Sequence, residues 1–282
     1  MIVDFHVHTF PEKISKNALE SMSRKSRTLY FTDGTEKQLR ESMIKNNVVY
    51  SVNLPVMTAP EQVLKLNSRI IGRQESLMAE GIIPFGGMHP LYENYRSELR
   101  RLRENGVPGI KIHPAYQGPD LDDIHYMRII DAASSEGLIV VTHAGIDIGI
   151  FDHDYASVNA VLHILKDVHP EKFVLAHMGG WGNWKQVESD LCGAPVYFDT
   201  AFSLGPVCAR KDKGRAPYLS ENLSPEDFIR ISVKHGTDRI LFATDSPWAR
   251  QGVYIDRIRS LGMSEEETDA ILGKNAAELL HL

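Results

Sequence analysis

The residues of this chain best suited to chemistry are two histidines near its beginning, His6 and His8. They lie in the short apolar segment Ile2–Val7, which predicts a β-strand. Successive side chains of a strand point to opposite faces, so His6 and His8 share one face while Phe5 and Val7 share the other. Two neighbouring imidazoles on one face form half of a zinc site. The alternative is that both are solvated residues of a frayed terminus.

Further short segments have the composition and length of strands. The predicted strands are Ile2–Val7, Val48–Leu54, Ile82–Gly86, Gly109–Ile112, Leu138–Thr142, Lys172–Ala176, Pro195–Asp199 and Arg239–Thr244. Segments with helical periodicity lie between most of them, namely Glu36–Lys45, Pro60–Glu80, Tyr95–Asn105, Tyr126–Ser135, Ser157–Val168, Trp184–Leu191 and Pro225–His235. A final helical pattern, Ser264–Leu280, opens with the capping-box residues Ser264 and Glu267.

Alternation of apolar strands with helices predicts an α/β fold with a parallel sheet covered on both faces. Eight such units in 282 residues fit a single, distorted (β/α)8 TIM barrel spanning residues 1–282. A doubly wound open sheet is the alternative, but no glycine-rich loop follows the first strand, where a dinucleotide-binding fold would place one. Two long insertions, Phe10–Thr35 and Ala201–Ser224, would overlie the mouth of the barrel and could form a lid.

Ionisable residues recur where the other predicted strands end. Lys111 and His113 close the fourth strand, His143 follows the fifth, His177 the sixth and Asp245 the eighth. In a TIM barrel these ends converge on one pocket. Burying so many ionisable groups without partners would cost several kcal/mol each, and a shared metal ion removes much of that cost. The sequence therefore predicts a metal site at the mouth of the barrel.

Composition excludes several classes of function. The chain is 43% hydrophobic and 24% charged, as in ordinary soluble proteins, and its net charge of −6 offers no basic surface for nucleic acid. No apolar stretch approaches the roughly 20 residues that cross a bilayer, and the first residues do not read as a signal peptide. Two cysteines provide neither a disulfide framework nor a metal knuckle. We expect a cytoplasmic protein that acts on a small-molecule substrate, without nucleic-acid or membrane partners; a homo-oligomer is left open.

The ordered motifs identify a family resemblance over the whole chain. They are His6-Val7-His8, Gly109-Ile110-Lys111-Ile112-His113-Pro114, His143, His177-Met178-Gly179-Gly180 and Thr244-Asp245-Ser246-Pro247-Trp248. Together they resemble the metal-dependent amidohydrolase superfamily of TIM barrels. The similar branch is the amidohydrolase-related one (amidohydrolase 2), which includes aminocarboxymuconate-semialdehyde decarboxylase and pyrone-dicarboxylate lactonase.

This resemblance implies that His6, His8, His143 and Asp245 hold a divalent metal ion, for which zinc is the expected identity. His177 would then bind a second metal or act as a free electrophile. Lys111 would bridge two metals if its amine were carboxylated. Unmodified, it would contact a substrate carboxylate or close the barrel mouth. One or two ions per chain both remain open.

Three further residues are expected to contact the substrate. His113 shares the face of Lys111, His89 ends the third predicted strand, and Trp248 follows Asp245. For both histidines a structural hydrogen bond is the alternative, and for the tryptophan it is buried packing. Other histidines at helix positions or turns are expected at the surface, among them His163, His169, His235 and His281.

The function that these residues predict is hydrolysis. A metal-activated water would attack an amide, ester or lactone bond, Asp245 would exchange protons with water and leaving group, and His177 would face the oxyanion. The alternative is a metal-dependent decarboxylase of a small unsaturated or aromatic acid, which needs the same ligands. A TatD-like nuclease is less favoured, since the charge disfavours DNA. A protein that only binds metal would need no such placement of Asp245.

Overall fold

The predicted strands form two ladders of parallel strands. The computed structural model describes residues 1–210 and 222–282. The first ladder contains β1 (Ile2–Val7), β2 (Val48–Asn53) and β3 (Ile82–Pro84), in that order. The second contains β4 (Gly86–Gly87), β5 (Gly109–Ile112), β6 (Ile139–Thr142), β7 (Phe173–Leu175), β8 (Tyr197–Asp199) and β9 (Ile240–Leu241).

Hydrogen bonds join the two ladders on both sides. β3 and β4 come from one predicted strand that is interrupted at Phe85, whose N–H still donates to Asn53 O of β2 at 3.1 Å. On the other side, Phe5 N–H donates to Phe242 O and Asp245 N–H donates to His6 O, both at 2.8 Å. The strands therefore close into the predicted (β/α)8 barrel, and the interruption at Phe85 is its main distortion.

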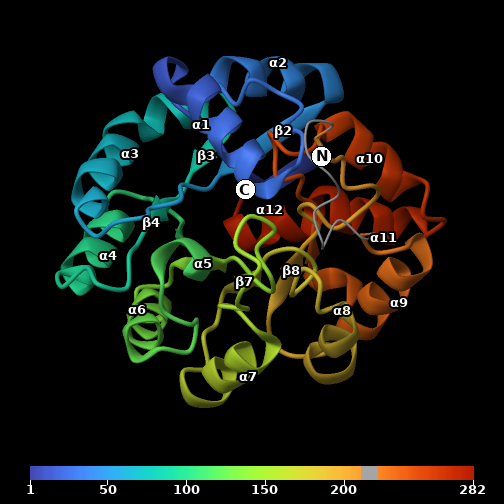
Figure 1. Ribbon diagram of the computed structural model, residues 1–282. Coiled ribbons are helices and arrows are strands. Elements are labelled where there is room, and N and C mark those ends of the chain that lie inside the picture. Colours follow the sequence, from blue (N-terminus) through green and yellow to red (C-terminus); the bar gives the residue numbers. More distant parts are fainter. Residues whose placement is uncertain (211–221) are drawn as a thin grey trace.

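Helices surround the strands (Figure 1). They are α1 (Glu12–Ser26), α2 (Glu36–Asn46), α3 (Gln62–Ala79), α4 (Tyr95–Glu104), α5 (Pro114–Gln117), α6 (Ile124–Ser135), α7 (Val158–Asp167), α8 (Trp184–Gln186), α9 (Pro225–His235), α10 (Gln251–Arg259), α11 (Glu265–Asp269) and α12 (Asn275–Leu280). Two π-helical turns, Val187–Leu191 and Ala270–Lys274, continue α8 and α11, and a 3₁₀ turn, Thr237–Arg239, precedes β9. In the part of the chain that the structure describes, no helix has the length and apolar character needed to cross a bilayer.

The helix signals in the sequence are confirmed where a pattern was present. The capping box forms as predicted, because Ser264 Oγ accepts from Glu267 N while the Glu267 carboxylate accepts from Ser264 N. Helix α1 was not predicted and lies within the insertion Phe10–Thr35; α10 was also missed.

Two apolar clusters fill the molecule. The larger lies between strands and surrounding helices, and the smaller lies inside the barrel, where Phe5, Phe85 and Val141 meet. Ala276 and Leu279 of α12 belong to the inner cluster and close one end of the barrel. Ionisable side chains are thereby confined to the opposite end of the interior.

Strand alternation explains which side chains reach that end. Leu241 and Ala243 lie in the inner cluster, and Asp245 follows two residues later on the same side. Val141 and His143 are related in the same way. Strand β1 departs from this rule, because its pairing with β2 shifts register between Asp4 and Val7. The prediction that Phe5 and Val7 share a side is therefore wrong: Phe5 belongs to the inner cluster and Val7 to the outer one.

His235 corrects the expectation that it is a surface residue. It ends α9, is 4% exposed, and stacks on Phe198 with ring centroids 3.7 Å apart. Its Nε2–H donates to Val196 O at 2.9 Å, and its Nδ1 accepts from Gly193 N–H at 3.2 Å. Acceptance by Nδ1 requires the neutral ring, and burial lowers the pKa of His235 to about 4.

We predict that His235 makes stability depend on pH below about 6.5. Between pH 6.5 and 4 the unfolded chain binds a proton that the folded chain does not, so the free energy of unfolding falls as the pH falls. Urea denaturation should show that the wild type loses about 2 kcal/mol more than His235→Gln between pH 7 and pH 5. The other titrating groups are common to both proteins and cancel. Parallel pH profiles for the two proteins would contradict the assignment.

Candidate functional site

A cavity of about 420 Å³ lies at the carboxyl ends of the strands. Its lining includes almost all residues predicted for the mouth, namely His6, His8, Lys111, His113, His143, His177, Asp245 and Trp248. Helix α1 covers one side with Ala18, Ser21 and Met22, so the first insertion does overlie the mouth. Of the second insertion, Phe202 lines the cavity, and residues 211–221 lie outside the described part of the chain.

His6, His8 and Asp245 form a group of metal-donor atoms that all lie within 4.8 Å of one another. The Nδ1 of His6 lies 2.8 Å from the Asp199 carboxylate, and the Nδ1 of His8 lies 2.7 Å from Leu54 O. Both acceptors require a proton on Nδ1, so each neutral ring carries a lone pair on Nε2. These two Nε2 atoms face each other at 3.2 Å, an arrangement that a cation between them stabilises.

The electrostatics of this group also favour a cation. Burial, and then the field of Lys111, lower the pKa of His6 well below its usual range, which keeps the ring neutral. Burial alone would raise the pKa of Asp245, but the pKa is lowered when the neighbouring histidines, His8 first, carry positive charge, so a positive charge beside this carboxylate is favoured. Asp245 Oδ1 lies 3.1 Å from His8 Nε2. Two neutral imidazoles and one carboxylate are ligands suited to zinc, and three protein ligands leave a position open for water.

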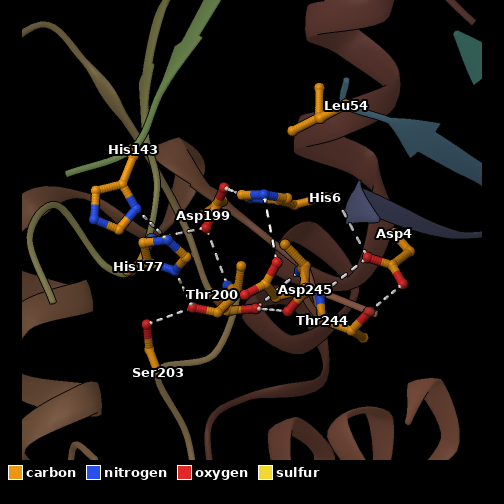
Figure 2. Close-up of polar contacts among 12 residues, drawn as sticks. Asp4, His6, Leu54, His143, His177, Asp199, Thr200, Ser203, Thr244 and Asp245 are labelled. Carbon is orange, nitrogen blue, oxygen red and sulfur yellow. Dashed lines mark hydrogen bonds and ion pairs between the residues drawn. The ribbon is translucent and has the colours of Figure 1, made fainter. Parts of the chain in front are cut away.

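Asp199 is a functional residue that sequence reasoning missed. It is fully buried at the end of β8, and Figure 2 shows it between His6 and His177. One carboxylate oxygen accepts from His6 Nδ1, and the other accepts from the backbone N–H groups of His177 and Ala201 at 2.9 and 3.0 Å. It orients His6 without entering the donor group, a role that alternation of Tyr197, Asp199 and Ala201 toward the interior could have suggested.

His143 is not part of the donor group of His6, His8 and Asp245. Its Nδ1 instead lies 3.1 Å from Nε2 of His177, whose Nδ1–H donates to Ala201 O at 2.8 Å. The ligand set expected from the resemblance stays a prediction, and the structure places His143 outside the group formed by the other three members. His6, His8 and Asp245 lie together. The ring of His143 turns toward the end of β7 and pairs with His177.

Lys111 occupies the cavity without a hydrogen-bond partner among the described residues. Its side chain is 1% exposed, and burial lowers the pKa of its amine to about 8. Its charge lowers the pKa of His6, His143 and His177, so its amine lies among the predicted metal ligands. A buried cation without a partner is a candidate for contact with an anion.

The three predicted substrate contacts differ in their positions. His113 and Trp248 line the cavity. His89 does not appear among the described residues of the lining, and its Nδ1 accepts from Leu91 N–H at 3.2 Å. This hydrogen bond within the loop after β4 favours the structural alternative for His89.

Two residues of the site have left-handed backbone angles. His177 has φ of 61° and Asp245 has φ of 62°. Side chains other than glycine adopt this region rarely, at a cost of about 1–2 kcal/mol, and such strain concentrates at functional sites.

We predict that Asp199→Asn weakens metal binding without unfolding the protein. An amide in place of the carboxylate cannot satisfy His6 Nδ1–H and two backbone N–H groups together, and loss of such a supporting contact typically lowers metal affinity about 10–100-fold. Competition titration with a zinc chelator measures the change. Asp131→Asn, an exposed position on α6, is the matched control. Equal affinities in the two variants would contradict the orienting role.

Comparisons with known proteins agree with this fold. The structure of 5-carboxyvanillate decarboxylase LigW from Sphingomonas paucimobilis is similar with a TM-score of 0.71 and 15% identity, over 100% of this chain and 99% of that one. Dihydroxybenzoic acid decarboxylase from Polaromonas sp. JS666, solved with bound manganese and 2-nitroresorcinol, has a TM-score of 0.71 and 15% identity. The match covers 100% of this chain and 97% of that one. A TIM-barrel protein from Bordetella bronchiseptica has a TM-score of 0.74 and 15% identity, over 99% of this chain and 98% of that one. These identities show the fold alone.

Sequence comparisons add the family. A search of curated proteins found no match. The family model described as Amidohydrolase matches residues 79–282, more than half of the chain, and this segment contains Lys111, His143, His177 and Asp245. With the barrel and the donor group at its mouth, this match shows that the chain belongs to the amidohydrolase family of metal-dependent enzymes.

Proposed function

We propose that the protein is a metal-dependent hydrolase that cleaves an amide, ester or lactone bond of a small substrate. The observation that carries this proposal is the donor group itself. His6, His8 and Asp245 place donor atoms within 4.8 Å of one another in a cavity large enough for a small organic molecule. His177 and Lys111 line the same cavity and supply a group that exchanges protons and a positive charge.

The residues of the chain would divide the chemistry as follows. A divalent ion held by His6, His8 and Asp245 would supply a bound water with a pKa of about 7 and would polarise the carbonyl group of the substrate. Asp245 accepts the proton of the attacking water and returns it to the leaving group. Asp199 holds the tautomer of His6 that this arrangement needs.

His177 has a more specific role than the oxyanion donor expected from the resemblance. Its Nδ1–H is committed to Ala201 O, so the neutral ring has no proton on Nε2. It can donate to an oxyanion only after Nε2 takes up a proton. Burial lowers the pKa of His177, while the charges of Asp245 and Asp199 favour the protonated ring. His177 would therefore take up a proton from solvent at Nε2 before the attack, donate a hydrogen bond to the oxyanion that forms, and keep the proton when the carbonyl group is restored.

Decarboxylation is the second candidate, and Lys111 is the observation that favours it. Its unpartnered ammonium lies in the cavity and could hold a carboxylate of the substrate. Two similar structures are decarboxylases by their names. A panel of lactones, esters, amides and aromatic acids separates the reactions. Acid release from lactones or esters supports hydrolysis, whereas carbon dioxide release from an aromatic acid with no hydrolytic turnover would replace the proposal by the lyase.

We predict that His177→Ala lowers kcat on the best substrate of this panel about 10²–10³-fold. Because His177 lies outside the donor group, the bound metal should remain, which elemental analysis of the same sample checks. His163→Ala, an exposed histidine of α7, is the control and should leave kcat unchanged. Loss of metal with loss of activity would instead make His177 a ligand.

The number of ions depends on Lys111. A second ion between His143 and His177 would need an anionic bridge, which Lys111 supplies only when its amine is carboxylated. We expect one ion per chain in the wild type and in Lys111→Met, and none in His6→Ala. Elemental analysis in buffer that contains bicarbonate makes the measurement. Two ions in the wild type and one in Lys111→Met would establish the bridged centre.

A further inference from the structure

A second group of polar side chains lies on the cavity wall after β5 and β6. His113, Tyr116 and Asp147 all line the cavity, and none belongs to the donor group of His6, His8 and Asp245. The ring of His113 stacks on His143, with centroids 4.4 Å apart, and meets the edge of Tyr116 at 4.6 Å. His113 Nε2 lies 3.6 Å from Asp147 Oδ2, while Asp147 Oδ1 accepts from Gly149 N–H at 2.8 Å.

This group is not a second metal site, although donor atoms of His113, His143 and Asp147 lie within 4.8 Å of one another. An imidazole binds a metal in the plane of its ring, along the nitrogen lone pair. The rings of His113 and His143 are inclined by only 15° and are stacked face to face. Lone pairs in two nearly parallel, stacked rings do not converge on one ion. The stacked pair must therefore serve another kind of ligand.

The unfilled hydrogen-bonding capacity of this wall points to that ligand. His113 Nδ1 and His143 Nε2 are buried and have no hydrogen-bond partner among the described residues. The 3.6 Å between His113 Nε2 and Asp147 Oδ2 is too long for a direct hydrogen bond and leaves room for one oxygen atom that bonds to both. Such an oxygen would pair with His113 Nε2 and Asp147 Oδ2, and His113 Nδ1 and His143 Nε2 are not its partners.

The charged residues around the gap between His113 and Asp147 restrict which kind of oxygen can occupy it. An anion would be repelled by the Asp147 carboxylate. A cation would be repelled by Lys25, whose field reaches Asp147. Lys25 lies on α1, with its amine 5.1 Å from the centre of the Tyr116 ring. A neutral group that donates one hydrogen bond and accepts another fits both partners.

We propose that His113 and Asp147 form a subsite that binds a hydroxyl group of the substrate. The hydroxyl donates to Asp147 Oδ2 and accepts from His113 Nε2–H, while Tyr116 and His143 hold the His113 ring in place. The inference rests on the proposed function for the identity of the cavity as the substrate site, and it deepens that function by naming the substrate class, a small hydroxylated compound.

The test compares phenol with toluene, two ligands of nearly equal size that differ by one hydroxyl. Transfer of apolar surface alone favours toluene, so a preference for phenol reports hydrogen bonding. Calorimetric titration of the metal-loaded wild type should give at least fivefold tighter binding of phenol. His113→Phe, which keeps a ring to stack on His143, and Asp147→Leu should each abolish the preference while toluene still binds. Retained toluene binding shows that the variants are folded.

Two further measurements complete the design. Met22→Leu, on the apolar wall from α1, should change the affinity for both ligands alike and leave the preference intact. His113→Phe and Asp147→Leu should leave the metal content unchanged; a loss of metal would make these residues ligands and overturn the subsite. Equal binding of phenol and toluene by the wild type would also overturn it, even for an active hydrolase. A preference for phenol without any hydrolysis would support the subsite and contradict the proposed function.

Discussion

The site depends on one buried carboxylate, that of Asp199. It receives Nδ1–H of His6 and the backbone N–H groups of His177 and Ala201, so three groups from β1 and from the ends of β7 and β8 meet on two oxygen atoms. Burial raises the pKa of Asp199, which shows how much the three donors are needed to keep it charged. Asp199 fixes the proton of His6 on Nδ1. The lone pair of His6 therefore lies on Nε2, the ring atom that faces His8 and Asp245. The chemistry of the mouth thus depends on a residue that does not touch the reaction.

A second buried carboxylate joins the first strand to the last. Asp4 accepts from the N–H and hydroxyl groups of Thr244 at 3.0 and 2.7 Å and from the amide of Gln251 at 2.9 Å. Burial raises its pKa to about 7, so these donors stabilise a charge that a dry interior disfavours. The contact with Thr244 places Asp245 beside His8, which lies far away in sequence. Closure of the barrel and assembly of the donor group are therefore one event.

The sequence predicted the parts of the fold and site that follow from local patterns. Apolar runs predicted the strands, and the ends of these strands predicted that Lys111, His143 and Asp245 gather at one mouth, where all three line the cavity. The ring planes of the histidines could not be predicted. They depend on acceptors such as Leu54 O and Ala201 O, which no local pattern reveals. The burial of His235 was missed for the same reason, since its partners come from the chain before β8.

Backbone strain at His177 and Asp245 shows how the barrel supports this site. Both residues hold left-handed angles that cost about 1–2 kcal/mol. Adjacent backbone hydrogen bonds offset that cost. Met178 N–H donates to Asp199 O at 2.7 Å. Asp245 N–H donates to His6 O, and Asp245 O accepts from Trp248 N–H, both at 2.8 Å. Two of these bonds, Met178 N–H to Asp199 O and Asp245 N–H to His6 O, join the ends of different strands. The closed barrel therefore supplies the bonds that support the strained turns, and these turns lie at the strand ends, beside the reactive side chains.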